Sequence, residues 1–112
     1  EHVTILGTGS PRREFLFSDD LANACYYLMQ NYDEPGMINV GTGEDITIKD
    51  LALLIQKIIG FEGDLVFDPS RPDGTPRKLL DVSKLHNKGW RHEVDLEQGI
   101  RMVYDDFIKN YA

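Results

Sequence analysis

The clearest structural signal in the sequence is an amphipathic pattern between Thr47 and Gly60. Apolar residues recur there every three or four positions, which is the spacing that places side chains on one face of an α-helix. Thr47 is a good N-cap residue, Asp50 follows three residues later as in a variant capping box, and Gly60 suits the left-handed conformation that ends many helices. The predicted buried face consists of Ile48, Leu51, Leu54, Ile55, Ile58 and Ile59.

Three more helices are predicted around this one. The first begins near Ser18 or Asp19, the last begins after Asp95, and a short one lies between Asp81 and Gly89. The apolar stripes are Leu21, Cys25, Leu28, Met29 and Tyr32 in the first helix, and Leu96, Ile100, Val103, Phe107 and Ile108 in the last. Cys25 is therefore expected to be a buried structural cysteine.

All the predicted strands are short and are bounded by turns rich in Gly or Pro. They cover residues 3–6, 15–17, 37–40 and 65–67, while residues 78–81 could form a strand or a turn, and residues 68–77 are expected to form a loop. The expected fold class is mixed α/β, with helices packed on short strands. At 112 residues the chain is one domain, because domains usually have about 100–200 residues.

Composition indicates a soluble globular domain and excludes several kinds of function. Hydrophobic residues make up 41% and charged residues 28% of the chain. No apolar run approaches the roughly 20 residues of a membrane helix, so no membrane partner is expected. One cysteine and three scattered histidines form no recognisable metal site, and the single cysteine fits a reducing, cytoplasmic compartment. The sequence begins with Glu1 rather than Met, so we expect it to be part of a longer protein.

The charge distribution points to a small anion rather than to nucleic acid. The net charge is −7, whereas proteins that bind nucleic acid usually carry a basic face. Residues 1–56 contain nine acidic and three basic side chains, but residues 71–91 contain six basic and two acidic ones. A small basic region on an acidic domain suits a small anionic ligand.

Several residues that could carry chemistry have simpler explanations. The turns at residues 7–9 and 41–43 both read Gly-Thr-Gly, but neither completes a dinucleotide-binding or P-loop motif, so they are predicted to be plain turns. Asp19 and Asp20 are interpreted as helix-start residues rather than an acid/base pair. His86 and His92 are expected to be ordinary, partly exposed side chains.

Two basic pairs, Arg12-Arg13 and Arg77-Lys78, each follow a loop stiffened by Pro and shaped by Gly. If the pairs converge, arginine would give a bidentate contact and lysine a point charge to a diphosphate. They could equally be solvated charges, or form salt bridges with the acidic N-terminal half. Asp73 could accept a hydrogen bond from a sugar hydroxyl or could simply form an Asp-Gly turn.

Residues 7–22 (GTGSPRREFLFSDDLA) and 38–43 (INVGTG) resemble segments found throughout the extended short-chain dehydrogenase/reductases. Residues 67–81 (FDPSRPDGTPRKLLD), continuing to Gly89-Trp90, resemble the GDP-L-fucose synthase family more specifically. The resemblance covers essentially all of residues 1–112 and identifies them as the substrate-binding C-terminal domain of such an enzyme.

The resemblance implies a reaction that needs more than this chain. The family epimerises C3 and C5 of GDP-4-keto-6-deoxy-mannose and reduces its 4-keto group with NADPH. The N-terminal Rossmann domain binds NADP and carries the catalytic residues, so no catalytic residue is expected here. The resemblance also implies a GDP-sugar substrate and a homodimeric full-length enzyme.

By the same resemblance, Arg13 corresponds to the arginine that holds the diphosphate and Lys78 to a substrate-binding lysine. Asp73 lies in the same matched loop and is carried over with them. Leu6 departs from the family pattern, which often has a substrate-contacting Trp there. Leu6 therefore keeps open the alternative of a UDP- or dTDP-sugar epimerase or dehydratase. A separate alternative is a stand-alone nucleotide-sugar binding module without catalysis.

Overall fold

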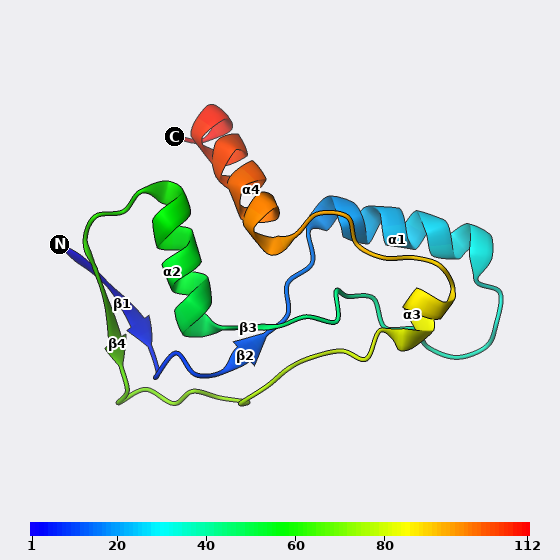
Figure 1. Ribbon diagram of the computed structural model, residues 1–112, viewed down its shortest axis with the longest axis horizontal. Helices are drawn as coiled ribbons and strands as arrows, with labels where there is room; N and C mark the ends of the chain where they lie inside the picture. The colour runs from blue at the N-terminus through cyan, green and yellow to red at the C-terminus, as the bar shows by residue number, and fades with distance from the viewer.

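The computed structural model describes residues 1–112 and confirms the mixed α/β class (Figure 1). Four helices and four short strands follow one another along the chain. Their order is β1 (His2–Leu6), β2 (Arg12–Arg13), α1 (Ser18–Asn31), β3 (Ile46–Thr47), α2 (Ile48–Ile59), β4 (Asp64–Asp68), α3 (Ser83–Asn87) and α4 (Leu96–Asn110).

The strands form two separate two-stranded sheets. β1 and β4 are parallel, with His2 opposite Asp64 and Leu6 opposite Asp68, and α2 lies beside them (Figure 1). β2 and β3 are antiparallel, and a single parallel bridge joins Arg12 to Arg77 on the other side of β2. The β2–β3 pair and the Arg12–Arg77 bridge lie in the middle of the molecule, between the end that contains β1 and β4 and the end that contains α1 and α3 (Figure 1).

The helix ends follow local chemistry where the sequence contains a good cap. The Thr47 hydroxyl accepts a hydrogen bond from the Asp50 N–H (3.1 Å), Gly60 adopts φ 71°, and the Asp95 carboxylate accepts from the Gln98 N–H (2.8 Å), so these predictions are confirmed. α1 begins at Ser18, as predicted, but neither Ser18 nor Asp19 caps it: the cap residue is Phe17, which makes no side-chain cap bond.

Asp20 lies in the first turn of α1, as expected, and also makes contacts that the sequence did not predict. Its two carboxylate oxygens accept hydrogen bonds from the backbone N–H groups of Glu93 (3.2 Å) and Val94 (3.0 Å). The residue is buried, and these two bonds tie the segment before α4 to the start of α1.

Two predicted strands are absent. Residues 15–17 and 37–40 join no sheet, and residues 78–81 contribute no named strand. No neighbouring segment of this chain offers either of the first two a ladder of hydrogen bonds, and a strand requires such a partner. Ile38 and Val40 instead pack against a small core of Ala24, Val82, Leu85 and Trp90.

Most of the apolar surface of the helices is uncovered. Only 11 of 112 residues are buried. Leu21 and Met29 of the predicted α1 stripe are exposed, with Met29 84% accessible, whereas Leu28 and Tyr32 are half-buried and Leu28 packs against the core. Cys25 was expected to be buried but is exposed, because Ala24 faces the core in its place. None of the four helices combines the length and apolar character of a membrane span.

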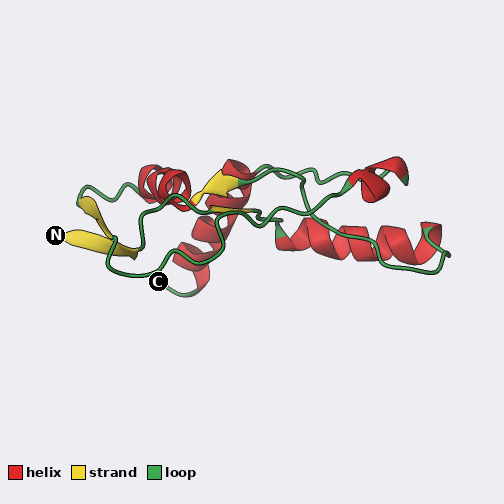
Figure 2. Ribbon diagram, turned by 90° about the horizontal axis from the view of Figure 1, so that it is seen from below, coloured by secondary structure: helices red, strands yellow, loops and turns green.

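The molecule is thin and elongated, as the view from below shows (Figure 2). It measures 52 × 35 × 17 Å, and its radius of gyration of 16.8 Å exceeds the value of about 13 Å typical of a compact domain of this length. Two open apolar grooves flank α2, one of about 550 Å³ shared with α4 and one of about 330 Å³ shared with the β1–β4 sheet.

Candidate functional site

The two basic pairs of the sequence converge at β2. The Arg12 N–H donates to the carbonyl of Pro76 (2.9 Å), and the Lys78 N–H donates to the carbonyl of Arg12 (3.2 Å). This parallel bridge lays residues 77–78 alongside residues 12–13, although more than sixty residues separate them in sequence. The convergence that the diphosphate hypothesis required is therefore present.

The register of this bridge separates the four cations into two groups. Arg12 and Arg77 share one face, and both bind Asp45, with Nε to carboxylate distances of 3.0 Å and 2.6 Å. Successive residues of an extended chain point to opposite faces, so this register places Arg13 and Lys78 on the other face. The salt-bridge alternative thus applies to one residue of each pair.

Asp45 is well suited to neutralise the first group. Its side chain is only 5% exposed, and this burial alone would raise the pKa of the carboxyl. Hydrogen bonds from both guanidinium groups outweigh burial and hold the pKa below its usual value. The carboxylate is therefore ionised and occupied.

Arg13 is oriented by backbone carbonyls instead of by an acid. Its Nη1 donates to the carbonyl oxygens of Arg12 and Thr75, both at 2.7 Å. Its Nε and Nη2 groups make no hydrogen bond within the chain, and neither Arg13 nor Lys78 takes part in an ion pair. The half-buried guanidinium is thus held in place with donors still free for an anion.

Asp73 joins the loop after β4 to the turn after β1. One carboxylate oxygen accepts from the Thr8 N–H (2.7 Å) and the other from the Thr8 hydroxyl (2.8 Å). These two bonds lower the pKa of Asp73. The turn interpretation fits Gly74, whose φ is +80°, while the contact of Asp73 with a sugar hydroxyl stays a prediction.

Both Gly-Thr-Gly turns bind carboxylates of the protein itself. Besides Thr8 with Asp73, the N–H groups of Thr42 and Gly43 donate to one oxygen of Glu14, at 2.8 Å and 2.7 Å. A turn whose amides are already satisfied in this way offers no cradle to a dinucleotide phosphate. These two turns therefore do not fit the phosphates of NADP.

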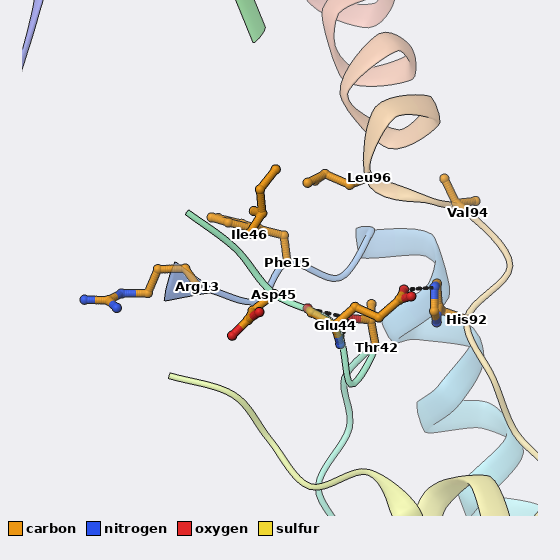
Figure 3. A pocket seen from close by; sticks show the side chains of 9 residues that line it. All are labelled: Arg13, Phe15, Thr42, Glu44, Asp45, Ile46, His92, Val94 and Leu96. Atoms are coloured by element: carbon orange, nitrogen blue, oxygen red, sulfur yellow. Dashed lines mark hydrogen bonds and ion pairs between the residues drawn. The ribbon is translucent and has the colours of Figure 1, made fainter. Parts of the chain in front are cut away.

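A pocket of about 260 Å³ lies next to this site, lined by nine residues that include Glu44, Asp45 and His92 (Figure 3). Figure 3 shows the guanidinium of Arg13 directed away from the other lining side chains. Arg13 lines this pocket but Asp73 and Lys78 do not, so the pocket does not bring the three predicted residues together.

The histidines lie beside this region and are half-buried, as expected. His92 Nε2 lies 3.6 Å from a carboxylate oxygen of Glu44. His86 Nε2 and His92 Nδ1 are buried without a hydrogen-bond partner. Burial, followed by the charges of Arg91 and His92, lowers the pKa of His86.

Sequence reasoning missed the roles of Asp45 and Glu14. Glu14 belongs to the motif that carries the family resemblance, but nothing local indicates that its carboxylate would reach residues 42, 43 and 80. Asp45 was covered only by the general expectation of salt bridges with the acidic half. Long-range pairs of this kind leave no periodic signal.

Comparison with known proteins finds relatives of this chain. Residues 1–41 match the NAD dependent epimerase/dehydratase family. GDP-L-fucose synthase 1 of Arabidopsis thaliana is 49% identical over 110 residues, which cover 98% of this chain and 34% of that protein. The chain is related to the C-terminal part of GDP-L-fucose synthases. It spans about a third of the length of these GDP-L-fucose synthase relatives.

Several solved structures resemble this chain in both fold and sequence. A GDP-mannoheptose C4 reductase from Campylobacter jejuni with NADP bound has a TM-score of 0.87 at 44% identity, covering 96% of this chain and 35% of that one. A UDP-glucose 4-epimerase from Thermotoga maritima with UDP-glucose has a TM-score of 0.89 at 29% identity, covering 100% and 36%. The fold therefore occurs with more than one nucleotide.

Proposed function

We propose that this chain is the nucleotide-sugar-binding part of a GDP-L-fucose synthase. The observation that carries the proposal is the state of Arg13. Two carbonyls fix its guanidinium, no carboxylate neutralises it, and the β2 register places Lys78 on the same face. The relationship to GDP-L-fucose synthases supplies the ligand class that such a pair would bind.

In this proposal, the chain binds and orients the substrate and performs no chemical step itself. Arg13 donates its free N–H groups to the oxygens of the diphosphate, and Lys78 adds a point charge. Asp73 accepts a hydrogen bond from a sugar hydroxyl. When bound elsewhere in the complete enzyme, NADPH supplies the hydride that reduces the 4-keto group.

The proposal is tested by steady-state kinetics of the complete enzyme. We expect Arg13→Ala to raise the KM for the GDP-sugar at least about tenfold and to change kcat much less, because one charge-assisted hydrogen bond contributes roughly 1.5–3 kcal/mol. Arg101→Ala, which removes the same charge from the exposed side of α4, is the control. An unchanged KM in Arg13→Ala would sink the assignment.

A UDP- or dTDP-sugar enzyme is the second possibility, favoured by the similarity to the UDP-glucose 4-epimerase and by Leu6. Leu6 ends β1 and is 66% exposed, so it leaves room where a larger aromatic side chain would stack. Comparing the KM values for GDP-, UDP- and dTDP-sugars separates the two. The homodimeric state and the cytoplasmic location stay predictions.

A further inference from the structure

We propose that Glu14 is a positioning residue that fixes Arg13 and Lys78 relative to each other for diphosphate binding. The inference rests on the proposed function. It concerns a side chain that holds the segments carrying the two cations and that does not itself contact the ligand.

The Glu14 carboxylate joins three segments. Oε2 accepts from the N–H groups of Thr42 (2.8 Å) and Gly43 (2.7 Å), and Oε1 accepts from the N–H of Leu80 (3.0 Å). Glu14 directly follows Arg13, and Leu80 lies two residues after Lys78. One carboxylate thus connects the segments that carry both cations to the glycine turn at residues 41–43.

The segment that carries Lys78 has few other attachments. Before it, the Lys78 N–H bonds to the Arg12 carbonyl, and after it the next backbone contact is the bond from Leu80 to Glu14. Leu79 and Leu80 are 38% and 42% exposed, so packing holds them weakly. Without the Glu14 bond, the next attachments after Lys78 would be the Asp81 carbonyl, which accepts from the Asn39 side chain (3.3 Å), and the buried Val82.

Gly41 shows that the fold makes room for this carboxylate. A Cβ atom at residue 41 would lie 2.5 Å from Oε2 of Glu14 and 3.0 Å from its carboxyl carbon. Real Cβ atoms do not approach so closely, so an alanine at this position would displace the Glu14 side chain. Gly41 has no positive φ, so alanine there brings steric crowding without backbone strain.

The chemistry of the carboxylate suggests a selective variant. Glu14→Gln keeps the size of the side chain but replaces one acceptor oxygen by an NH2 group, which only donates. Whichever way the amide turns, it opposes a donor either to the Leu80 N–H or to the N–H groups of the turn. One of the two connections is therefore lost while the packing is retained.

The test uses the complete enzyme and a matched control. Asp20 also accepts two backbone N–H groups, from Glu93 and Val94, and these bonds do not involve the segments that carry Arg13 and Lys78. We expect Glu14→Gln to raise the KM for the nucleotide sugar at least about threefold, with the KM for NADPH and kcat within twofold. We expect Asp20→Asn to lower the melting temperature about as much as Glu14→Gln does, because each variant removes one acceptor of backbone N–H groups. Asp20→Asn should nevertheless leave the KM for the nucleotide sugar unchanged.

Gly41→Ala provides a second route, since it displaces the carboxylate without removing it, and the same rise in KM is expected. The inference is overturned if both variants leave this KM within twofold, or if Asp20→Asn raises it equally, while Arg13→Ala still raises it. If Arg13→Ala and Lys78→Ala also leave the KM unchanged, the proposed function and this inference fall together.

Discussion

At the residue scale, three carboxylates determine which groups stay free for a ligand. Asp45 forms salt bridges with Arg12 and Arg77, two of the four cations around β2. Glu14 and Asp73 accept hydrogen bonds from backbone N–H groups of the two glycine turns. The cations that no acid neutralises are Arg13 and Lys78. The site is therefore defined as much by these internal pairings as by the residues expected to touch substrate.

A substitution at Gly7 tests whether the Asp73 side chain is held in a fixed position. Its φ is +92°, and a Cβ atom there would lie 2.4 Å from a carboxylate oxygen of Asp73. Gly36 has φ +106° with nothing within 4 Å, so Gly36→Ala introduces backbone strain alone, of about 1–3 kcal/mol. In the complete enzyme we expect Gly7→Ala to lower the free energy of unfolding by at least about 1 kcal/mol more than Gly36→Ala. Equal losses in urea unfolding would show that Asp73 moves aside freely.

At the element scale, the predictions succeeded where the signal is local. The ends of α2 and α4 depend on Thr47, Gly60 and Asp95, and each behaves as its residue type predicts. Residues 15–17 and 37–40 have strand-like composition but no partner strand in this chain. β2 and β3, with two residues each, are too short for any periodicity to reveal.

The same distinction applies to the site. The two basic loops could be predicted from the residue types, because Pro and Gly beside Arg and Lys form a local pattern. Their convergence could be stated only as a condition of the diphosphate hypothesis, because it depends on a bridge between distant segments. The division of the four cations by Asp45 could not be predicted, because it depends on a register set by contacts between distant segments.

α2 offers a direct test of local capping. Thr47→Ala removes the hydroxyl that accepts from the Asp50 N–H, and we expect the free energy of unfolding of the complete enzyme to fall by about 1 kcal/mol. Thr47→Ser keeps the acceptor and should lose much less. Chemical denaturation measures both, and equal stability of the alanine variant and the parent would show that the cap contributes nothing.

At the scale of the whole molecule, the chain is too thin to bury its own apolar surface. The outer faces of α1 and α4 and the grooves beside α2 are open, and Val103 and Phe107 are 59% and 52% exposed. Exposed apolar patches of this extent usually mark surfaces that other chain segments or proteins cover.

The isolated 112-residue chain should therefore be marginally stable. We expect it to bind the dye ANS, to associate in sedimentation experiments, and to unfold with low cooperativity. Charged substitutions at Val103 and Phe107 should reduce the association. A monomer that unfolds in one sharp transition without binding ANS would contradict this view of the apolar faces.

The most direct test of the central claim is the affinity of the complete enzyme for GDP, measured by calorimetry for the parent, Arg13→Ala, Lys78→Ala and the double variant. If both side chains bind one diphosphate, each single change weakens binding at least about tenfold, and the two effects are not additive. The Arg101→Ala control should bind as the parent does. Affinities within twofold of the parent in all three variants would contradict the claim that Arg13 and Lys78 hold the diphosphate.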